Sequence, residues 1–166
     1  MNPLELPPFA ALRRNHALEH ATLHVLSERN QRLRLVGRSD WNGFTLYGSA
    51  DIEQVADAVM SALERLQAGE SSLAVHPRCG TSVAAGVTLA GLASYVALSG
   101  RRTAWWRKTV RLLLGLGAAL AITPSLGLKL QEHLTTSAKA SAVRVMGIRR
   151  REVGAVVMHR ITTRQD

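Results

Sequence analysis

Apolar residues in the first third of the chain recur first at the spacing of a helix and then at the spacing of strands. Residues 9–29 are good helix formers with apolar faces, and Asn30 is a plausible end to that helix. Residues 32–40 alternate long and apolar side chains, and residues 43–49 form a second β-prone stretch. The Asn-Gly pair at 42–43 favours a tight turn between them, so we expect a β-hairpin.

A second helix is predicted directly after the hairpin. Residues 51–69 carry apolar side chains at intervals of three and four, with Asp51 placed to cap the start and Gly69 placed to end the helix. The predicted buried stripe consists of Ile52, Val55, Val59, Leu63 and Leu66. Residues 71–77 are then a candidate for a short third strand.

Two long apolar segments follow. Residues 81–100 contain no charge, and their length matches the roughly 20 residues that cross a bilayer. Residues 112–128 are near the lower limit of about 17 residues, and Pro124 predicts a kink or a stop. The connector is basic and holds paired Trp at 105–106, as at a membrane interface. We therefore predict a transmembrane helical hairpin; the alternative is a buried hairpin in a soluble core.

Two further strands are predicted at residues 141–150 and 154–163. Their simplest role is to pair with the first hairpin and complete one small antiparallel sheet packed against two helices. The predicted fold is therefore α+β, in the order αββα…ββ, interrupted by the two-helix transmembrane hairpin. We divide the chain into residues 1–80, the first part of the α+β domain; residues 81–128, the hairpin; and residues 129–166, which complete the sheet.

Positive charge is concentrated in the second half of the chain. Residues 1–80 hold eight Arg, no Lys and nine acidic residues, for a net charge of −1, whereas residues 81–166 hold thirteen basic and three acidic residues, for a net charge of +10. Because the second half also holds the apolar segments, the charge points to a bilayer with anionic headgroups before nucleic acid. Aromatic residues are scarce and no basic stripe is interleaved with them, so an RNA-binding platform does not fit.

Compartment and topology follow from weaker signals. A single cysteine excludes an intrachain disulfide and fits a reducing compartment. The first residues lack the basic start and apolar stretch of a signal peptide. We therefore expect an integral membrane protein with both termini and any site facing the cytoplasm. The basic connector, however, favours a cytoplasmic position for itself, so topology stays open, as does oligomeric state.

The sequence HALEH at residues 16–20 carries the strongest chemical signal. Residues three and four apart are neighbours on a helix, so His16, Glu19 and His20 are expected on one side. Two imidazoles one turn apart can bind one zinc ion, and the carboxylate can act as the general base toward water. H-x-x-E-H is the inverted zincin order. The alternative is a helix with a polar, solvated face.

A zinc site needs a third protein ligand, and Cys79 is the candidate. It lies in the segment HPRCGTS, directly before the first apolar helix, where a helix N-terminus favours a thiolate. His76 is a candidate for a fourth or supporting role, and so is His24, one turn beyond His20. Cys79 taken alone is more often a small buried residue. The two remaining histidines show no such pattern and are expected to be structural or at the surface: His133 and His159.

These residues carry a resemblance to a known superfamily. HALEH, followed by a helix end, a hairpin and an amphipathic helix, resembles the insulinase-type (pitrilysin) metallopeptidases, in which an HFLEH-like helix packs on an antiparallel sheet. S-ribosylhomocysteine lyase belongs to the same superfamily, and CGT at residues 79–81 resembles the segment that supplies its third zinc ligand. The resemblance implies that His16, His20 and Cys79 bind zinc and that Glu19 is the acid/base.

The combination HALEHAT…HPxCGT is also typical of an uncharacterised bacterial membrane-associated family. This resemblance implies a bacterial inner membrane and supplies no activity. The preferred hypothesis is a membrane-anchored, zinc-dependent hydrolase of the peptidase or amidase type, acting on a peptide or small molecule not yet identified. Two alternatives stay open: a zinc-dependent lyase or isomerase of a small metabolite, in which zinc stabilises an enolate, and a non-catalytic metal-binding or structural membrane module.

Overall fold

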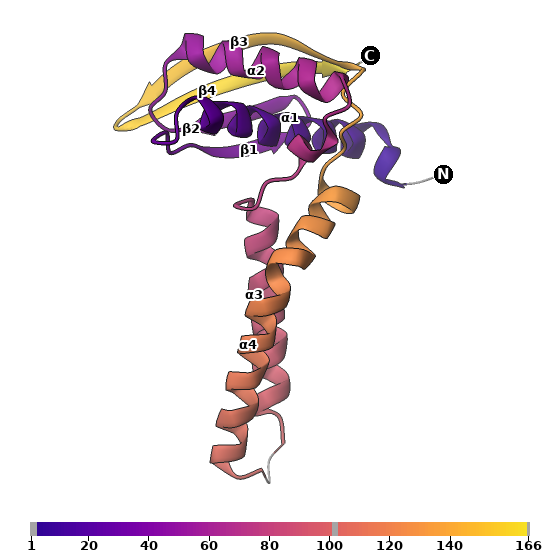
Figure 1. Ribbon diagram of the computed structural model, residues 1–166, viewed down its shortest axis with the longest axis vertical. Helices are drawn as coiled ribbons and strands as arrows, with labels where there is room; N and C mark the ends of the chain where they lie inside the picture. Colours follow the sequence, from indigo (N-terminus) through magenta and orange to yellow (C-terminus); the bar gives the residue numbers. More distant parts are fainter. Residues whose placement is uncertain (1–2, 101–102, 166) are drawn as a thin grey trace. The chain divides into compact units, whose positions relative to one another are not determined.

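The computed structural model describes residues 3–100 and 103–165 (Figure 1). Their contacts divide the chain into two compact units. One unit is built from both parts of the chain that flank the long helices, up to His76 and from Glu132 onward. The other comprises residues 77–131. Each unit is described separately below.

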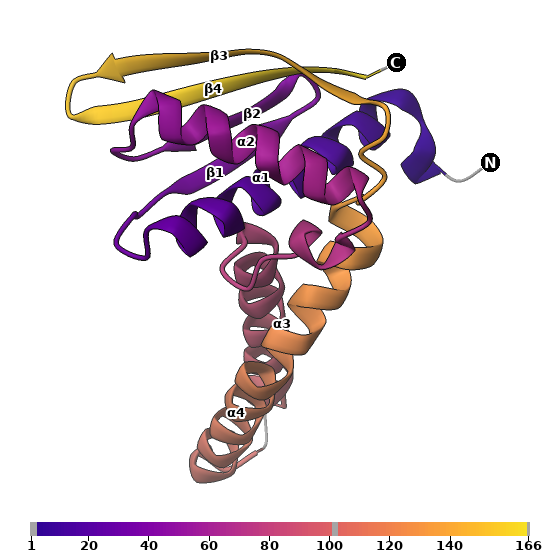
Figure 2. The ribbon, with the colours of Figure 1, turned by 45° about the horizontal axis from the view of Figure 1, so that its top comes forward.

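The first unit is α+β, as predicted. Its sheet is antiparallel with the strand order β1-β2-β4-β3, so the two predicted hairpins join through β2 and β4. Helices α1 and α2 lie side by side against one face of this sheet (Figure 2). The bounds of these elements are α1 Pro7–Arg29, β1 Val36–Asp40, β2 Gly43–Tyr47, α2 Ile52–Gln67, β3 Val143–Val153 and β4 Val156–Gln165.

The core of the first unit lies between the sheet and the two helices. In β2, Phe44 and Leu46 are fully buried. Thr45 and Tyr47, which alternate with them, are only partly buried, as the two-residue period of a strand requires. The Asp51 carboxylate accepts a hydrogen bond from the Glu53 N–H, which confirms the predicted cap of α2. The α2 stripe is buried at Val55, Val59, Leu63 and Leu66, while Ile52, in the first turn, is only partly buried.

Two predictions for the first unit are wrong in detail. The first strand begins at Val36 rather than Arg32, because β2 ends at Tyr47, the partner of Val36. Gly48 then turns away with φ +132°, and its N–H bonds to the Val157 carbonyl. Residues 71–77 do not add a strand: Ser71–Ala74 is a short 3₁₀ helix.

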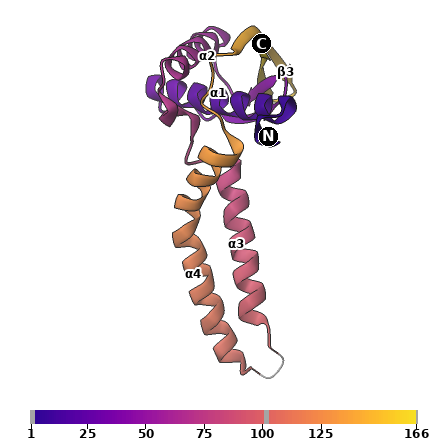
Figure 3. The ribbon, with the colours of Figure 1, turned by 90° about the vertical axis from the view of Figure 1, so that its right-hand side faces the viewer.

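The second unit is a pair of long helices, α3 (Gly80–Leu98) and α4 (Trp105–Leu130), which pack against each other (Figure 3). Both are long and apolar enough to cross a membrane. Only 17% of the most apolar 18-residue stretch of α3 is buried, and only 11% of that of the helical span Trp105–Thr135, which contains α4. This exposure is more typical of a membrane segment than of the core of a soluble protein. A π-helical turn, Gln131–Thr135, follows α4.

Of the two outcomes predicted for Pro124, a kink or a stop, the stop does not occur, because α4 continues to Leu130. Proline removes one backbone donor, and nearby hydroxyl groups can bond the carbonyls around such a gap. The Thr123 hydroxyl donates to the Ala119 carbonyl at 2.6 Å. Further along, the Gln131 amide donates to the Ser82 hydroxyl at 2.9 Å, which links the end of α4 to the start of α3.

Candidate metal centre

His20 of α1 is held as a metal ligand would be. Its ring is buried, and Nδ1 lies 2.8 Å from the carbonyl oxygen of Ala74. Because a carbonyl only accepts, Nδ1 carries the proton and Nε2 presents its lone pair. Nε2 is buried and has no hydrogen-bond partner among the described residues. A neutral imidazole whose second nitrogen donates to a carbonyl is the usual arrangement of a histidine ligand.

His16, one turn earlier on α1, is oriented in the same way. Its Nδ1 lies 3.0 Å from the carbonyl oxygen of Thr135, which fixes Nδ1–H as the donor. The ring centroids of His16 and His20 are 4.3 Å apart. Both rings therefore present their Nε2 atoms from one side of one helix, as the four-residue spacing predicts.

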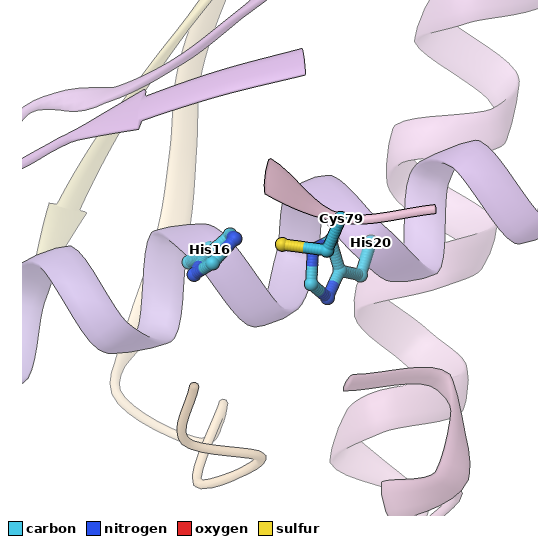
Figure 4. A group of neighbouring side chains, drawn as sticks. All are labelled: His16, His20 and Cys79. Carbon is cyan, nitrogen blue, oxygen red and sulfur yellow. The ribbon is translucent and has the colours of Figure 1, made fainter. Parts of the chain in front are cut away.

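The segment that leads to Cys79 is anchored to α1. Ala74 accepts from His20, and the Val75 carbonyl accepts from His24 Nε2 at 2.8 Å. Cys79 follows His76 by three residues, a span of at most about 11 Å for an extended chain. The ligand atoms of His16, His20 and Cys79 lie within 4.8 Å of one another, and Figure 4 shows the sulfur directed toward the two rings.

The chemistry of this donor set fits zinc. Two imidazole nitrogens and one thiolate sulfur are ligand types that zinc takes in proteins. The Thr81 N–H lies 3.4 Å from the Cys79 sulfur at the start of α3, and this contact stabilises the thiolate form that a metal requires. The group can therefore hold a metal ion, as the sequence predicts, and the identity of that ion is taken up below.

Glu19 is hydrogen-bonded to the sheet. Its side chain is buried, and its Oε2 accepts a hydrogen bond of 2.5 Å from the Ser39 hydroxyl of β1. The carboxylate fills the space beside Gly37, where a Cβ atom would overlap it. Among the described residues, the group of potential ligands does not include Glu19. Its assignment as the general base remains a prediction.

His24 and His76 line the same region. Their ring centroids are 4.8 Å apart, and the His76 ring is 5.8 Å from that of His20. His24 holds the chain at Val75 and thereby helps to keep the segment before Cys79 against α1. This arrangement suits the supporting role predicted for both residues, and that role remains a prediction.

The other two histidines lie outside the group. His133 is exposed in the turn after α4. His159 is fully buried in β4, and burial lowers the pKa of its imidazole, with the nearby charge of Arg150 acting in the same direction.

The sequence analysis missed the carbonyl groups of Ala74 and Thr135, which orient His20 and His16. A backbone acceptor can belong to any residue, so no residue type in the sequence indicates it.

The fold and the site define a small α+β protein with two helices long enough to cross a membrane and a His–His–Cys group able to hold a metal. The chain belongs to the family described as Domain of unknown function (DUF6391), whose model matches residues 11–148 and so includes all three potential ligands. This confirms the expected membership of an uncharacterised family. The resemblance to the HxxEH metallopeptidases is not confirmed.

One relative gives a measure of the similarity. An uncharacterized protein of Picosynechococcus sp. is 38% identical over 142 residues, covering 76% of this chain and 66% of the relative. This chain therefore spans slightly less than two thirds of the relative's length. No solved structure matches the chain.

Proposed function

We propose that the protein is a membrane-anchored, zinc-dependent hydrolase of the peptidase or amidase type. The observation that carries the proposal is the state of His20: Nδ1 is held by the Ala74 carbonyl, while the buried Nε2 has no partner among the described residues. An unsatisfied buried polar atom costs about 1–3 kcal/mol. A metal ion held by His20 together with His16 and Cys79 would supply the missing interaction.

Three protein ligands are the number found in catalytic zinc sites, where the fourth position is kept for water or substrate. Here His16, His20 and Cys79 would hold the ion. When bound, zinc supplies a Lewis acid that polarises a carbonyl group and makes water a better nucleophile near neutral pH. The carbonyls of Ala74 and Thr135 orient the two imidazoles and raise their basicity through the Nδ1 protons.

We assign proton transfer to Glu19. It precedes His20 on the same helix, and the Ser39 hydroxyl fixes one of its oxygens. Its packing against Gly37 removes the carboxylate from bulk water, and a carboxylate is one of the groups that act as general bases. In this role Glu19 takes a proton from water and returns it to the leaving group.

The location that fits best is a bacterial inner membrane, with both termini and the site facing the cytoplasm. Support comes from the two long apolar helices and from the positive charge of the second half of the chain, which suits anionic headgroups. The substrate class would then be a peptide or amide that reaches the bilayer surface. Reporter fusions after residue 3 and within residues 103–104 test this topology.

A specific observation favours a second candidate, a non-catalytic metal-binding module. Among the described residues, the group of potential ligands consists of two histidines and one cysteine, and the one hydrogen bond given for the Glu19 carboxylate comes from Ser39 of β1. The lyase or isomerase alternative needs the same metal and a small-molecule substrate, and it is separated from the hydrolase by the reaction products.

The test begins with metal content of the full-length protein purified in detergent. We expect about one zinc ion per chain. His20→Ala and Cys79→Ser should each lose most of this zinc, whereas His133→Ala, which changes an exposed histidine, should retain it. Full zinc content in both ligand variants would contradict the site.

The second stage separates an enzyme from a carrier. Hydrolysis of a fluorogenic peptide library is compared for the wild type, Glu19→Gln and the control Glu28→Gln, an exposed residue of the same helix. We expect Glu19→Gln to keep its zinc and lose at least about 100-fold in turnover, within the usual range for a general base. Equal turnover in all three proteins would exclude the assigned role.

A further inference from the structure

The sheet face opposite α1 and α2 carries six arginines. Within the first unit, no described helix or strand covers this face (Figures 1 and 2). The strand register places alternate residues of each strand on it, except that a β-bulge between Val145 and Gly147 shifts the alternation in β3 by one residue. Every basic residue on this face is Arg. These residues are Arg38, Arg144, Arg149, Arg151, Arg160 and Arg164.

Like charges stand directly opposite each other on this face. Arg149 of β3 pairs with Arg160 of β4, and Arg144 pairs with Arg164. Such cross-strand pairs are destabilising in the absence of counter-charge. Asp40 offsets part of the charge, because its two oxygens accept hydrogen bonds from the Arg160 guanidinium at 2.7 and 2.9 Å. In the described part of the chain, neither Arg149 nor Arg151 has an acidic partner.

These arginines border a defined hollow. A depression of about 530 Å³ lies over β2, β3 and β4 and is lined by Arg149, Arg151 and Arg160. Its volume falls within the ~300–1,000 Å³ typical of small-molecule sites. Tyr47 and Met158, which are direct cross-strand neighbours, form an apolar part of the wall beside Arg151.

The side chains that line the hollow indicate which class of ligand it can bind. Arginine binds phosphate through two parallel N–H···O bonds, which a lysine cannot do. A flat aromatic side chain next to a thioether suits a planar ring. One aromatic residue and a bounded hollow do not suit a long single-stranded nucleic acid, which needs successive stacking positions.

We propose that this face is a binding site for a small organic phosphate with a planar ring, of the size of a nucleoside diphosphate. Its phosphates bond to Arg149 and Arg151, and its ring packs against Tyr47 and Met158. Arg160, held by Asp40, supplies further positive charge at the floor of the site. The proposal is independent of the metal centre, since none of these residues belongs to that group.

The experiment is a fluorescence titration of the full-length protein, in a zwitterionic detergent, with a ribose-labelled fluorescent ADP, followed by competition with unlabelled ADP and pyrophosphate. Arg149→Gln and Arg151→Gln should each raise Kd at least about tenfold, as expected for the loss of a charge-assisted contact. The matched control is Arg150→Gln on the same strand. Its side chain points to the opposite face and pairs with Glu152, so its Kd should stay within about twofold.

A charge-conserving variant and a folding control complete the experiment. Arg149→Lys keeps the charge but not the paired donors, so its Kd should lie between those of the wild type and Arg149→Gln. Thermal unfolding of each variant verifies that the fold is intact. Absence of ADP binding at millimolar concentration, or an equal loss in Arg150→Gln, would overturn the proposal. So would pyrophosphate binding as tight as ADP, or tighter binding of a single-stranded RNA or of anionic vesicles that competes with ADP.

Discussion

Gly37 of β1 and the carboxylate of Glu19 on α1 occupy adjoining space so closely that a Cβ atom at residue 37 would overlap the carboxylate. Ser39, two residues further along the strand and on the same face, donates its hydroxyl proton to Glu19 Oε2. The strand thus provides one residue with no side chain and one with a hydrogen-bond donor. Together they define where the buried carboxylate can lie.

Gly37→Ala should therefore displace Glu19 and lower the free energy of unfolding by about 1–3 kcal/mol, the usual cost of overpacking. Urea unfolding in detergent measures this change. Gly147→Ala on β3 is the matched control, because no atom lies within 4 Å of its added Cβ. In the double variant Gly37→Ala/Glu19→Ala the overlap is removed, so part of the loss should return. Equal losses in the two single variants would contradict this account.

His24 tests whether anchoring of the segment before Cys79 matters for metal binding. His24→Ala removes the hydrogen bond to the Val75 carbonyl without removing a proposed ligand. Supporting contacts of this kind typically contribute about 10- to 100-fold in metal affinity. We expect a loss in that range, measured by competition with a zinc chelator, while His133→Ala should bind as the wild type does. An unchanged affinity in His24→Ala would assign that hydrogen bond to the fold alone.

His159 predicts a pH dependence of stability. Burial lowers the pKa of its imidazole below the ordinary 6.5, so the folded protein resists protonation while the unfolded chain accepts a proton. The contribution of neutral His159 to the free energy of unfolding is fully present above pH 6.5. It is lost as the pH falls from there through the lower pKa of His159 in the folded protein. Urea unfolding of the metal-free protein should show this loss.

The comparison that isolates this group uses His159→Leu, which cannot take up a proton. Its free energy of unfolding should fall less than that of the wild type as the pH is lowered below 6.5. His133→Leu, at an exposed position, should follow the wild-type curve. If the curves of the wild type and His159→Leu are parallel, another group is responsible.

The packing of the two long helices gives a further prediction. A Cβ atom at Gly127 of α4 would overlap the side chain of Ser82 on α3, so the two helices approach closely there. Small residues at such positions allow close contact between apolar helices. Gly127→Leu should lower the thermal unfolding temperature in detergent, whereas Gly117→Leu in the same helix, with no atom within 4 Å of the added Cβ, should have little effect.

Local patterns were sufficient to predict the fold class. The two-residue period of β2 and the three-to-four-residue period of α2 correspond to the buried positions Phe44, Leu46, Val55 and Val59. The sequence did not reveal that β2, rather than β1, pairs with the second hairpin, because both edges of a hairpin offer the same backbone groups. The choice depends on non-local contacts such as that of Gly43 with the Ile161 carbonyl, where φ +139° and close approach both require glycine.

Helix geometry was sufficient to predict the histidine pair of the site. A four-residue step keeps His16 and His20 on one side, but a one-residue step turns a helix by about 100°, so Glu19 faces β1 while His20 faces Ala74. The segment 71–77 was a candidate for a short strand. It instead begins with a 3₁₀ helix, and the carbonyls of Ala74 and Val75 accept from His20 and His24 of α1.

The order of the strands has a consequence for biosynthesis. β2 emerges from the ribosome early, yet its second neighbour, β4, lies beyond both long apolar helices. Throughout that interval the nascent chain carries a strand edge without a partner and an incomplete core, a state prone to non-native association. Both apolar helices therefore leave the ribosome before the sheet can close. Factors that shield nascent chains would act in that interval.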